Sequence, residues 1–153
     1  MTAEDLLADF IDSTLGGAYP ILRACTSDFA EQLARAVERL KPFIIVAYSG
    51  RTGASYYTGD GEIQDIWVTG TFAISVTNPS PLLASLGDVY AIAHEIVVAI
   101  DGEALVTPFT PRPLLVKSTS YTYDDASTSA AAVSARIVVQ AEFSLSAATG
   151  PEA

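Results

Sequence analysis

Residues 66–77 read IWVTGTFAISVT, and this segment decides the fold. Isoleucine, valine, glycine and phenylalanine occupy every second position, while threonine, serine, alanine and tryptophan stand between them. Because successive side chains of a strand point to opposite faces, this alternation predicts a strand with one core face and one face rich in threonine and serine. The predicted core set is Ile66, Val68, Gly70, Phe72, Ile74 and Val76.

Three further strands are predicted around this one. Residues 43–48 form a continuous apolar run, which is typical of a strand covered on both faces. Residues 114–123 and 133–145 are predicted as two more strands, and glycine-rich residues 49–65 are either a long loop or a hairpin of weak strands. The last strand has the inward set Val133, Ala135, Ile137, Val139, Ala141, Phe143 and Leu145.

Helical spacing of apolar residues predicts three helices, over residues 4–15, from about 28 to 40, and from about 83 to 100. A glycine pair at 16–17, Pro42 and an Asp-Gly pair at 101–102 end them. The predicted apolar faces are Leu6, Leu7, Phe10, Ile11 and Leu15 on the first helix; Phe29, Leu33, Val37 and Leu40 on the second; and Leu86, Val89, Tyr90, Ala93, Val97 and Ile100 on the third.

The resulting order, α-α-β-β-α-β-β, places two hairpins around a helix. It predicts an α+β fold with a mainly antiparallel sheet of four to five strands and helices packed on it. The sequence contains no internal repeat and no linker, so residues 1–153 are predicted to form a single domain. Its core spans about 4–145, and residues 146–153 are expected to form a frayed tail.

The charge balance of the 153 residues restricts the classes of partner. Eight basic and 18 acidic residues give a formal net charge of −10. Specific nucleic-acid binding and binding to anionic membranes are therefore not expected, because both need a concentrated basic patch. Charged residues make up only 17% of the chain, which favours a surface partly covered by other subunits over a serine- and threonine-rich monomer.

Compartment signals are few. The most apolar run, residues 89–100, is interrupted by His94 and Glu95, so no membrane span is predicted. The chain begins with acidic residues where a signal peptide would be basic, so the protein is expected to be made and kept soluble. Cys25 stands alone and cannot form an internal disulfide.

No catalytic, cofactor-binding or metal-binding constellation is predicted, and the chain is not expected to be an enzyme. His94-Glu95 lacks the second histidine that a zinc-protease helix needs, and Cys25 would need His94 beside it to act as a nucleophile. Residues 50–55 lack the spacing and the lysine of a phosphate loop. The acidic residues at 60–65 and 124–125 are interpreted as solvated turns rather than calcium ligands.

Several of these segments occur in a recognisable order: the helix at 4–15, the strand at 42–50, the strand end at 72–78, the helix at 87–96, the Pro-Leu-Leu connector at 113–115 and the strand end at 139–143. This order resembles that of the tail terminator (tail completion) proteins of long-tailed bacteriophages, especially their Mu-like branch. The resemblance covers residues 4–145 and rests on segment order rather than residue identity. Two departures from the family are the insert at 50–62, rich in tyrosine and glycine, and the low charge density.

The resemblance implies a structural role in the virion. It implies an α+β subunit that forms a homo-oligomeric ring, typically a hexamer, which caps the tail tube and docks onto the head-side connector or neck protein. It also implies a location in the neck region of the tail after synthesis in the host cytoplasm. The family has no catalytic motif, so no active-site residues are carried over.

Within such a ring, loops that join strands project beyond the sheet and meet neighbours. The insert at 50–62 and the hairpin tip at 124–129 are therefore predicted to lie near subunit or partner contacts. Tyrosine suits such a place because its ring packs while its hydroxyl stays hydrogen-bonded. The interface candidates are Tyr56, Tyr57, Asp60, Glu62, Asp124 and Asp125.

Two other classes of protein remain open on the sequence. One is a monomeric ligand-binding α+β domain with an aromatic site, and the other is a small acidic hydrolase that depends on His94. The ligand-binding class would draw its aromatic site from Tyr56, Tyr57, Trp67, Tyr121 and Tyr123.

Overall fold

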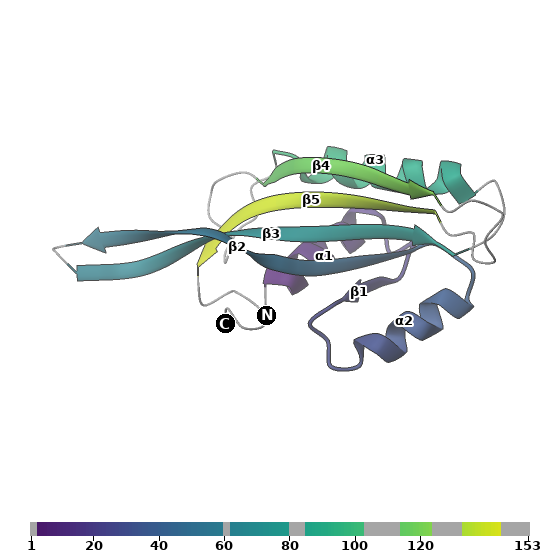
Figure 1. The fold of residues 1–153 in the computed structure, drawn as a ribbon, viewed down its shortest axis with the longest axis horizontal. Coiled ribbons are helices and arrows are strands. Elements are labelled where there is room, and N and C mark those ends of the chain that lie inside the picture. The colour runs from purple at the N-terminus through teal and green to yellow at the C-terminus, as the bar shows by residue number, and fades with distance from the viewer. Residues whose placement is uncertain (1–2, 60–61, 80–84, 103–113, 124–132, 145–153) are drawn as a thin grey trace.

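A computed structural model describes residues 3–59, 62–79, 85–102, 114–123 and 133–144, and these form one sheet with helices packed on it (Figure 1). The predicted α+β class with a mainly antiparallel sheet is confirmed. In chain order the elements are α1 (Ala3–Thr14), β1 (Ile21–Arg23), α2 (Phe29–Glu38), β2 (Phe43–Gly59), β3 (Glu62–Asn78), α3 (Ser85–Ile100), β4 (Leu115–Tyr123) and β5 (Val133–Ser144).

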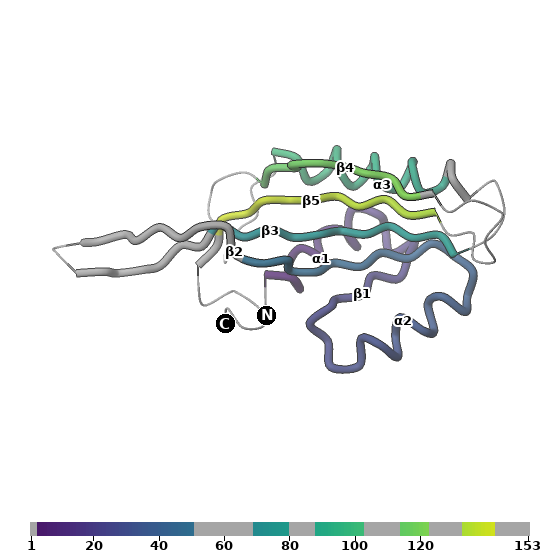
Figure 2. The backbone as a smooth tube through the Cα atoms, viewed as in Figure 1, coloured from purple at the N-terminus to yellow at the C-terminus, as the bar shows by residue number. Residues whose placement is uncertain are grey.

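The strand order across the sheet is β1-β2-β3-β5-β4, as the backbone trace in Figure 2 shows. Neighbouring strands pair antiparallel except at the β1 edge, where Ile21 lies beside Ile44 in a parallel pair. β1 is an addition to the predicted strands. It is only three residues long, and it is held by β2, since the Ile44 N–H donates to the Pro20 carbonyl (2.9 Å) and the Ala24 N–H to that of Val46 (3.0 Å).

The main core lies between the sheet and helices α1 and α3. Phe72, Ile74 and Val76 of β3 are completely buried, which confirms the face assigned from the alternation. Side chains of Ile66 and Val68, also predicted to face inward, lie outside the described residues. Strands β2 and β5 add the buried residues Ile44, Val46, Val133, Ala135, Ile137, Val139 and Ala141.

Helix α3 buries a slightly different face from the predicted one. Val89, Ala93 and Ile100 are buried as expected, and so are Ile92 and Ile96, which had not been assigned to this face. Tyr90 was predicted to be in the core but is 43% exposed. Its ring stands edge-on to Tyr121 of β4, with centroids 4.6 Å apart, so it covers the rim of the core rather than filling it.

Helix α2 packs on the opposite face of the sheet, over β1 and β2. Leu22 and Phe43 alternate with the main-core residues of their strands, and they form a second small core with Ala36. The predicted apolar stripe of this helix is correct at Phe29 and Leu33 but wrong at Val37 and Leu40, which are 44% and 56% exposed. The helix ends at Glu38 and contacts the sheet through positions 29, 33 and 36, so Val37 is turned toward solvent and Leu40 lies beyond the last turn.

The glycine-rich segment after residue 48 forms strand rather than loop. β2 and β3 are each 17 residues long and pair as far as Gly59 and Glu62. β5 stops pairing with β3 at Trp67, so residues 56–59 and 62–66, hereafter the hairpin extension, continue past the end of β5 as two strands (Figure 1). A register shift between Tyr48 and Gly50 marks a bulge, and Gly50 has φ +136°, a conformation that favours glycine.

Candidate functional site

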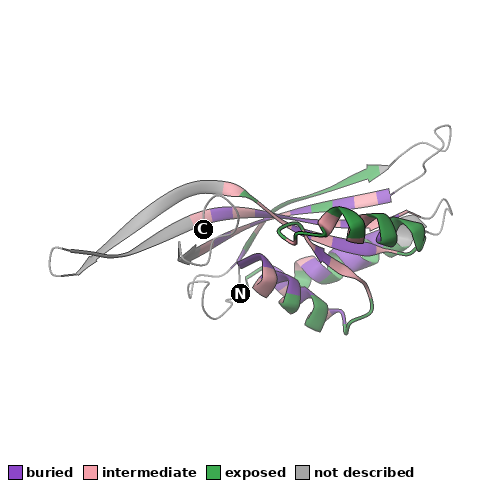
Figure 3. Cartoon of the chain, turned by 90° about the horizontal axis from the view of Figure 1, so that it is seen from below, coloured by how far each residue is buried: buried purple, intermediate pink, exposed green. Residues whose placement is uncertain are grey.

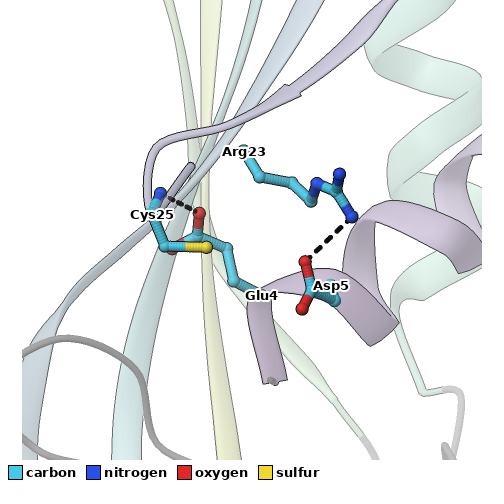
Figure 4. Close-up of polar contacts among 4 residues, drawn as sticks. All are labelled: Glu4, Asp5, Arg23 and Cys25. Atoms are coloured by element: carbon cyan, nitrogen blue, oxygen red, sulfur yellow. Dashed lines mark hydrogen bonds and ion pairs between the residues drawn. The ribbon is translucent and has the colours of Figure 1, made fainter. Parts of the chain in front are cut away.

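A buried carboxylate ties α1 to the β1 edge of the sheet (Figure 4). Glu4 is 2% exposed, and its two carboxylate oxygens accept hydrogen bonds from the backbone N–H groups of Cys25 (2.8 Å) and Tyr48 (3.1 Å). Asp5, the next residue, forms an ion pair with Arg23 at 2.9 Å. These contacts hold the helix against the end of β1 and the middle of β2, and we assign Glu4 a positioning role in the fold.

The two residues considered for chemistry are not brought together. His94 is exposed on α3, which packs on β3, β5 and β4. Cys25 is exposed in the turn after β1, at the opposite edge of the sheet. A histidine that activates a cysteine must lie within hydrogen-bonding distance of the thiol, and this arrangement does not provide that pair.

Alanine at either position is expected to leave assembly and function unchanged. His94 is a surface residue, and Cys25 contributes its backbone N–H to Glu4, a group that alanine retains. Each single variant should keep its free energy of unfolding to within about 0.5 kcal/mol of the parent. Chemical denaturation measures this, and incorporation into particles measures function. Loss of function in a variant that still folds and assembles would contradict the structural interpretation of these two residues.

For three of the six predicted interface residues the structure describes the backbone alone, and the other three lie outside the described residues. Tyr56 and Tyr57 lie on the β2 strand of the hairpin extension, and Glu62 is the first residue of β3. The backbone pairs Tyr57 with Asp65 and Glu62 with Gly59. Asp60, Asp124 and Asp125, together with the predicted hairpin tip at 124–129, lie outside the described residues.

The aromatic residues of the ligand-binding alternative do not form one site. Tyr121 pairs with Ala135 of β5, whereas Trp67 pairs with Ser144 at the far end of that strand. At a rise of about 3.4 Å per residue, these two positions are about 30 Å apart. Tyr56 lies farther still along the hairpin extension, so the aromatic residues are spread along the sheet.

On the face of the sheet against which α2 packs, no described helix covers β3, β5 or β4. This open face consists of the side chains that alternate with the core on β3, β5 and β4, and most of them are small and neutral. β4 is exposed along most of its length (Figure 3). The open face includes Thr71, Ser75, Thr77, Ser118, Ser120, Thr122, Ser134, Val138 and Gln140, and it confirms the predicted threonine- and serine-rich surface of β3.

A cleft of about 710 Å³ lies at the other end of β2 from the hairpin extension. Residues 17–20, in the turn between α1 and β1, form one wall, and Ala36, Arg39 and Lys41 at the end of α2 form the other. A smaller cleft of about 300 Å³ shares Tyr19 and Pro20 with the larger one and is also lined by Asp9 and Asp12 of α1 and by Arg23. Sequence reasoning missed the larger cleft because its walls come from segments about twenty residues apart, each of which is an ordinary helix end.

Within the described ranges, no three histidine, cysteine or acidic side chains are placed to hold a metal ion. None of the described helices is both long and apolar enough to cross a lipid bilayer.

Comparison with known proteins gives a likeness of fold. Neither a protein-family model nor a curated protein sequence matches the chain. Among solved structures, a chain of the structure described as "Virion of native gene transfer agent (GTA) particle" superposes with a TM-score of 0.54 at 12% sequence identity. The match covers 94% of this chain and 95% of that chain, so the two share their fold almost from end to end.

Proposed function

We propose that this chain is a structural virion protein that forms a homo-oligomeric ring, typically a hexamer, at the end of a tail tube and joins the tube to the head-side connector. The observation that carries the proposal is the fold likeness to a chain of a gene transfer agent virion, over 94% of one chain and 95% of the other. Independently, the order of segments in the sequence resembles the tail terminator family.

The surface of the sheet supports a role in assembly. β4 is an edge strand with residues 117–122 all exposed, and the open face beside it is mostly neutral. Leu115 and Tyr121 on the same strand are 49% and 46% exposed. Monomeric proteins usually protect such edges with charge, proline or a covering segment, because an unpaired edge recruits other chains. A subunit that packs against copies of itself has a use for this surface.

The hairpin extension supports the same conclusion. A two-stranded hairpin is marginally stable alone in water, and three or more strands or a packed helix are normally needed. β2 and β3 nevertheless pair out to Gly59 and Glu62, beyond the end of β5. A neighbouring subunit or the tail tube would supply the missing packing surface in the assembled particle.

The charge of the chain suits a ring through which DNA passes. A net charge of −10 per subunit repels the phosphate backbone, so DNA would pass through the opening without binding to its wall. The partners expected on this account are further copies of the chain, the tail tube protein and the head-side connector.

Cross-linking of purified particles, followed by mass spectrometry, tests the proposal. We expect cross-links between identical copies of the chain and cross-links from the chain to the tube-forming protein. Particles that lack the chain, or cross-links that are all within one copy, would contradict it. A monomeric mass of 16.1 kDa in dilute buffer would be compatible with the proposal, because the tail tube can act as the template that drives ring formation.

A further inference from the structure

Basic residues are concentrated at one end of this acidic chain. Three of its eight lysines and arginines, Arg35, Arg39 and Lys41, lie within seven residues at the C-terminal end of α2, and all three are exposed. Arg35 reaches Glu31 at 3.8 Å, but both side chains are about two-thirds exposed. An exposed pair of this kind contributes little to stability, so this basic cluster is available to a partner.

The basic cluster borders the larger cleft. Arg39 and Lys41 line its α2 wall, and the half-buried Tyr19 and Pro20 add aromatic and apolar surface. A volume of about 710 Å³ accommodates a few side chains of a partner rather than a whole element. The cleft therefore suits a segment that carries both aromatic and acidic residues.

Leu40, between these two basic residues, indicates that the surface is used. It has φ +53°, in the left-handed region that costs a non-glycine residue about 1–2 kcal/mol, and its side chain is 56% exposed. Val37, one turn earlier, is 44% exposed. An isolated chain gains little from two apolar side chains in solvent, one of them on a strained backbone, whereas a docked partner would bury both.

The complementary surface belongs to the hairpin extension. Tyr56 and Tyr57 lie on its β2 strand, and Glu62 and Asp65 lie on its β3 strand. The extension contains no lysine or arginine. The aromatic and acidic residues of the hairpin extension are thus complementary to the apolar and basic residues around the larger cleft.

One chain cannot bring these two surfaces together. The cleft lies at Phe43, where β2 begins, and the hairpin extension lies where β2 ends at Gly59 (Figure 1). A strand of 17 residues at about 3.3 Å per residue separates them by roughly 50 Å. Any contact between them must therefore join two copies.

We propose that the hairpin extension of one copy docks in the basic cleft at the end of α2 of the next copy. This inference rests on the proposed ring and names the contact that builds it. The contact is head-to-tail, so each copy offers one extension and one cleft, and a fixed rotation at each step closes a ring. Opposite charges at its rim guide association and fix the register of the two copies.

Charge reversal tests this contact. One variant carries Arg39→Glu and Lys41→Glu, a second carries Glu62→Lys and Asp65→Lys, and a third carries all four. A control with Asp88→Lys and Glu95→Lys makes the same change in charge as the second variant, at exposed sites on α3. Denaturation of each variant checks that the fold is retained, and assembly is followed by sedimentation over a range of concentrations and on tail tubes.

We expect each single-sided reversal to raise the concentration needed for assembly by about tenfold or more. The fourfold variant should assemble within a factor of about three of the parent, because both sides of the contact are reversed together. Single-sided variants that assemble like the control, or a fourfold variant no better than they are, would overturn the docking contact. The ring itself would then stand if the parent still assembled, so the two proposals fail separately.

A disulfide trap gives an independent measurement on assembled particles. In a Cys25→Ala background, Lys41→Cys and Glu62→Cys are introduced together, and mild oxidation is expected to link the chains into covalent multimers. A matched pair of Glu95→Cys and Glu62→Cys should stay unlinked, because Glu95 is exposed on α3, far from the basic cleft. Assembled particles in which residue 62 links to a different protein, or in which the 41–62 pair does not link at all, would overturn the contact.

Discussion

Phe72→Ala is expected to lower the free energy of unfolding by about 3–5 kcal/mol. Phe72 is completely buried at the centre of β3, and its ring packs against that of Tyr48 with centroids 5.3 Å apart. Truncation removes the buried ring and leaves a cavity between β2, β5 and the helices, which the surrounding residues fill only in part. Urea denaturation measures the change through the shift in its midpoint.

The neighbouring position provides the control for this variant. Thr71 lies on the open face of the same strand, and Thr71→Ala should change stability by about 0.5 kcal/mol or less. The free energy of unfolding of a domain of this size is usually about 5–15 kcal/mol in total, so Phe72→Ala should remove a large part of it. A loss below about 1 kcal/mol at Phe72 would show that the two faces of β3 had been assigned the wrong way round.

Glu4→Ala is expected to lower the free energy of unfolding by about 2–4 kcal/mol. Each hydrogen bond to a charged group is worth roughly 1.5–3 kcal/mol, and part of this loss is offset because the variant has no carboxylate to desolvate on folding. The variant leaves the backbone N–H groups of Cys25 and Tyr48 without their carboxylate acceptor. Glu4→Gln should cause a smaller loss, since its amide keeps one accepting oxygen but turns an N–H₂ group toward the other donor.

Asp5→Ala is the matched control for Glu4→Ala, one residue along the same helix. Its partner Arg23 has a side chain that is 41% exposed, and such ion pairs contribute about 1 kcal/mol or less. Thermal or urea unfolding of the three variants should rank the losses as Glu4→Ala, then Glu4→Gln, then Asp5→Ala. A Glu4→Ala variant as stable as Asp5→Ala would contradict the positioning role of the buried carboxylate.

The sequence predicted the core strands well because alternation is a strong local signal. The buried sets of β3 and β5 follow directly from every second residue, and the run at 43–48 is covered on both faces as expected. α2 was harder to predict. Its apolar residues spread over more surface than β1 and β2 can cover, and the sequence does not reveal that Val37 and Leu40 are left outside.

Tertiary contacts decide the features that the sequence did not predict. β1 has three residues and no pattern of its own, and it becomes a strand because β2 offers it a parallel edge. An acidic residue in the first turn of a helix is normally a surface group, so nothing in the local sequence indicates that Glu4 is buried. The larger cleft likewise exists only once the turn at 17–20 is placed beside the end of α2.

Electron cryo-microscopy of intact particles tests the central claim most directly. A C-terminal tag identifies the chain, and particles from a deletion strain serve as the control. We expect several copies, typically six, in one closed ring at the head-proximal end of the tail tube. Each hairpin extension should reach the α2 end of the next copy. A single copy per particle, or no density for the chain anywhere on the tail, would contradict the account.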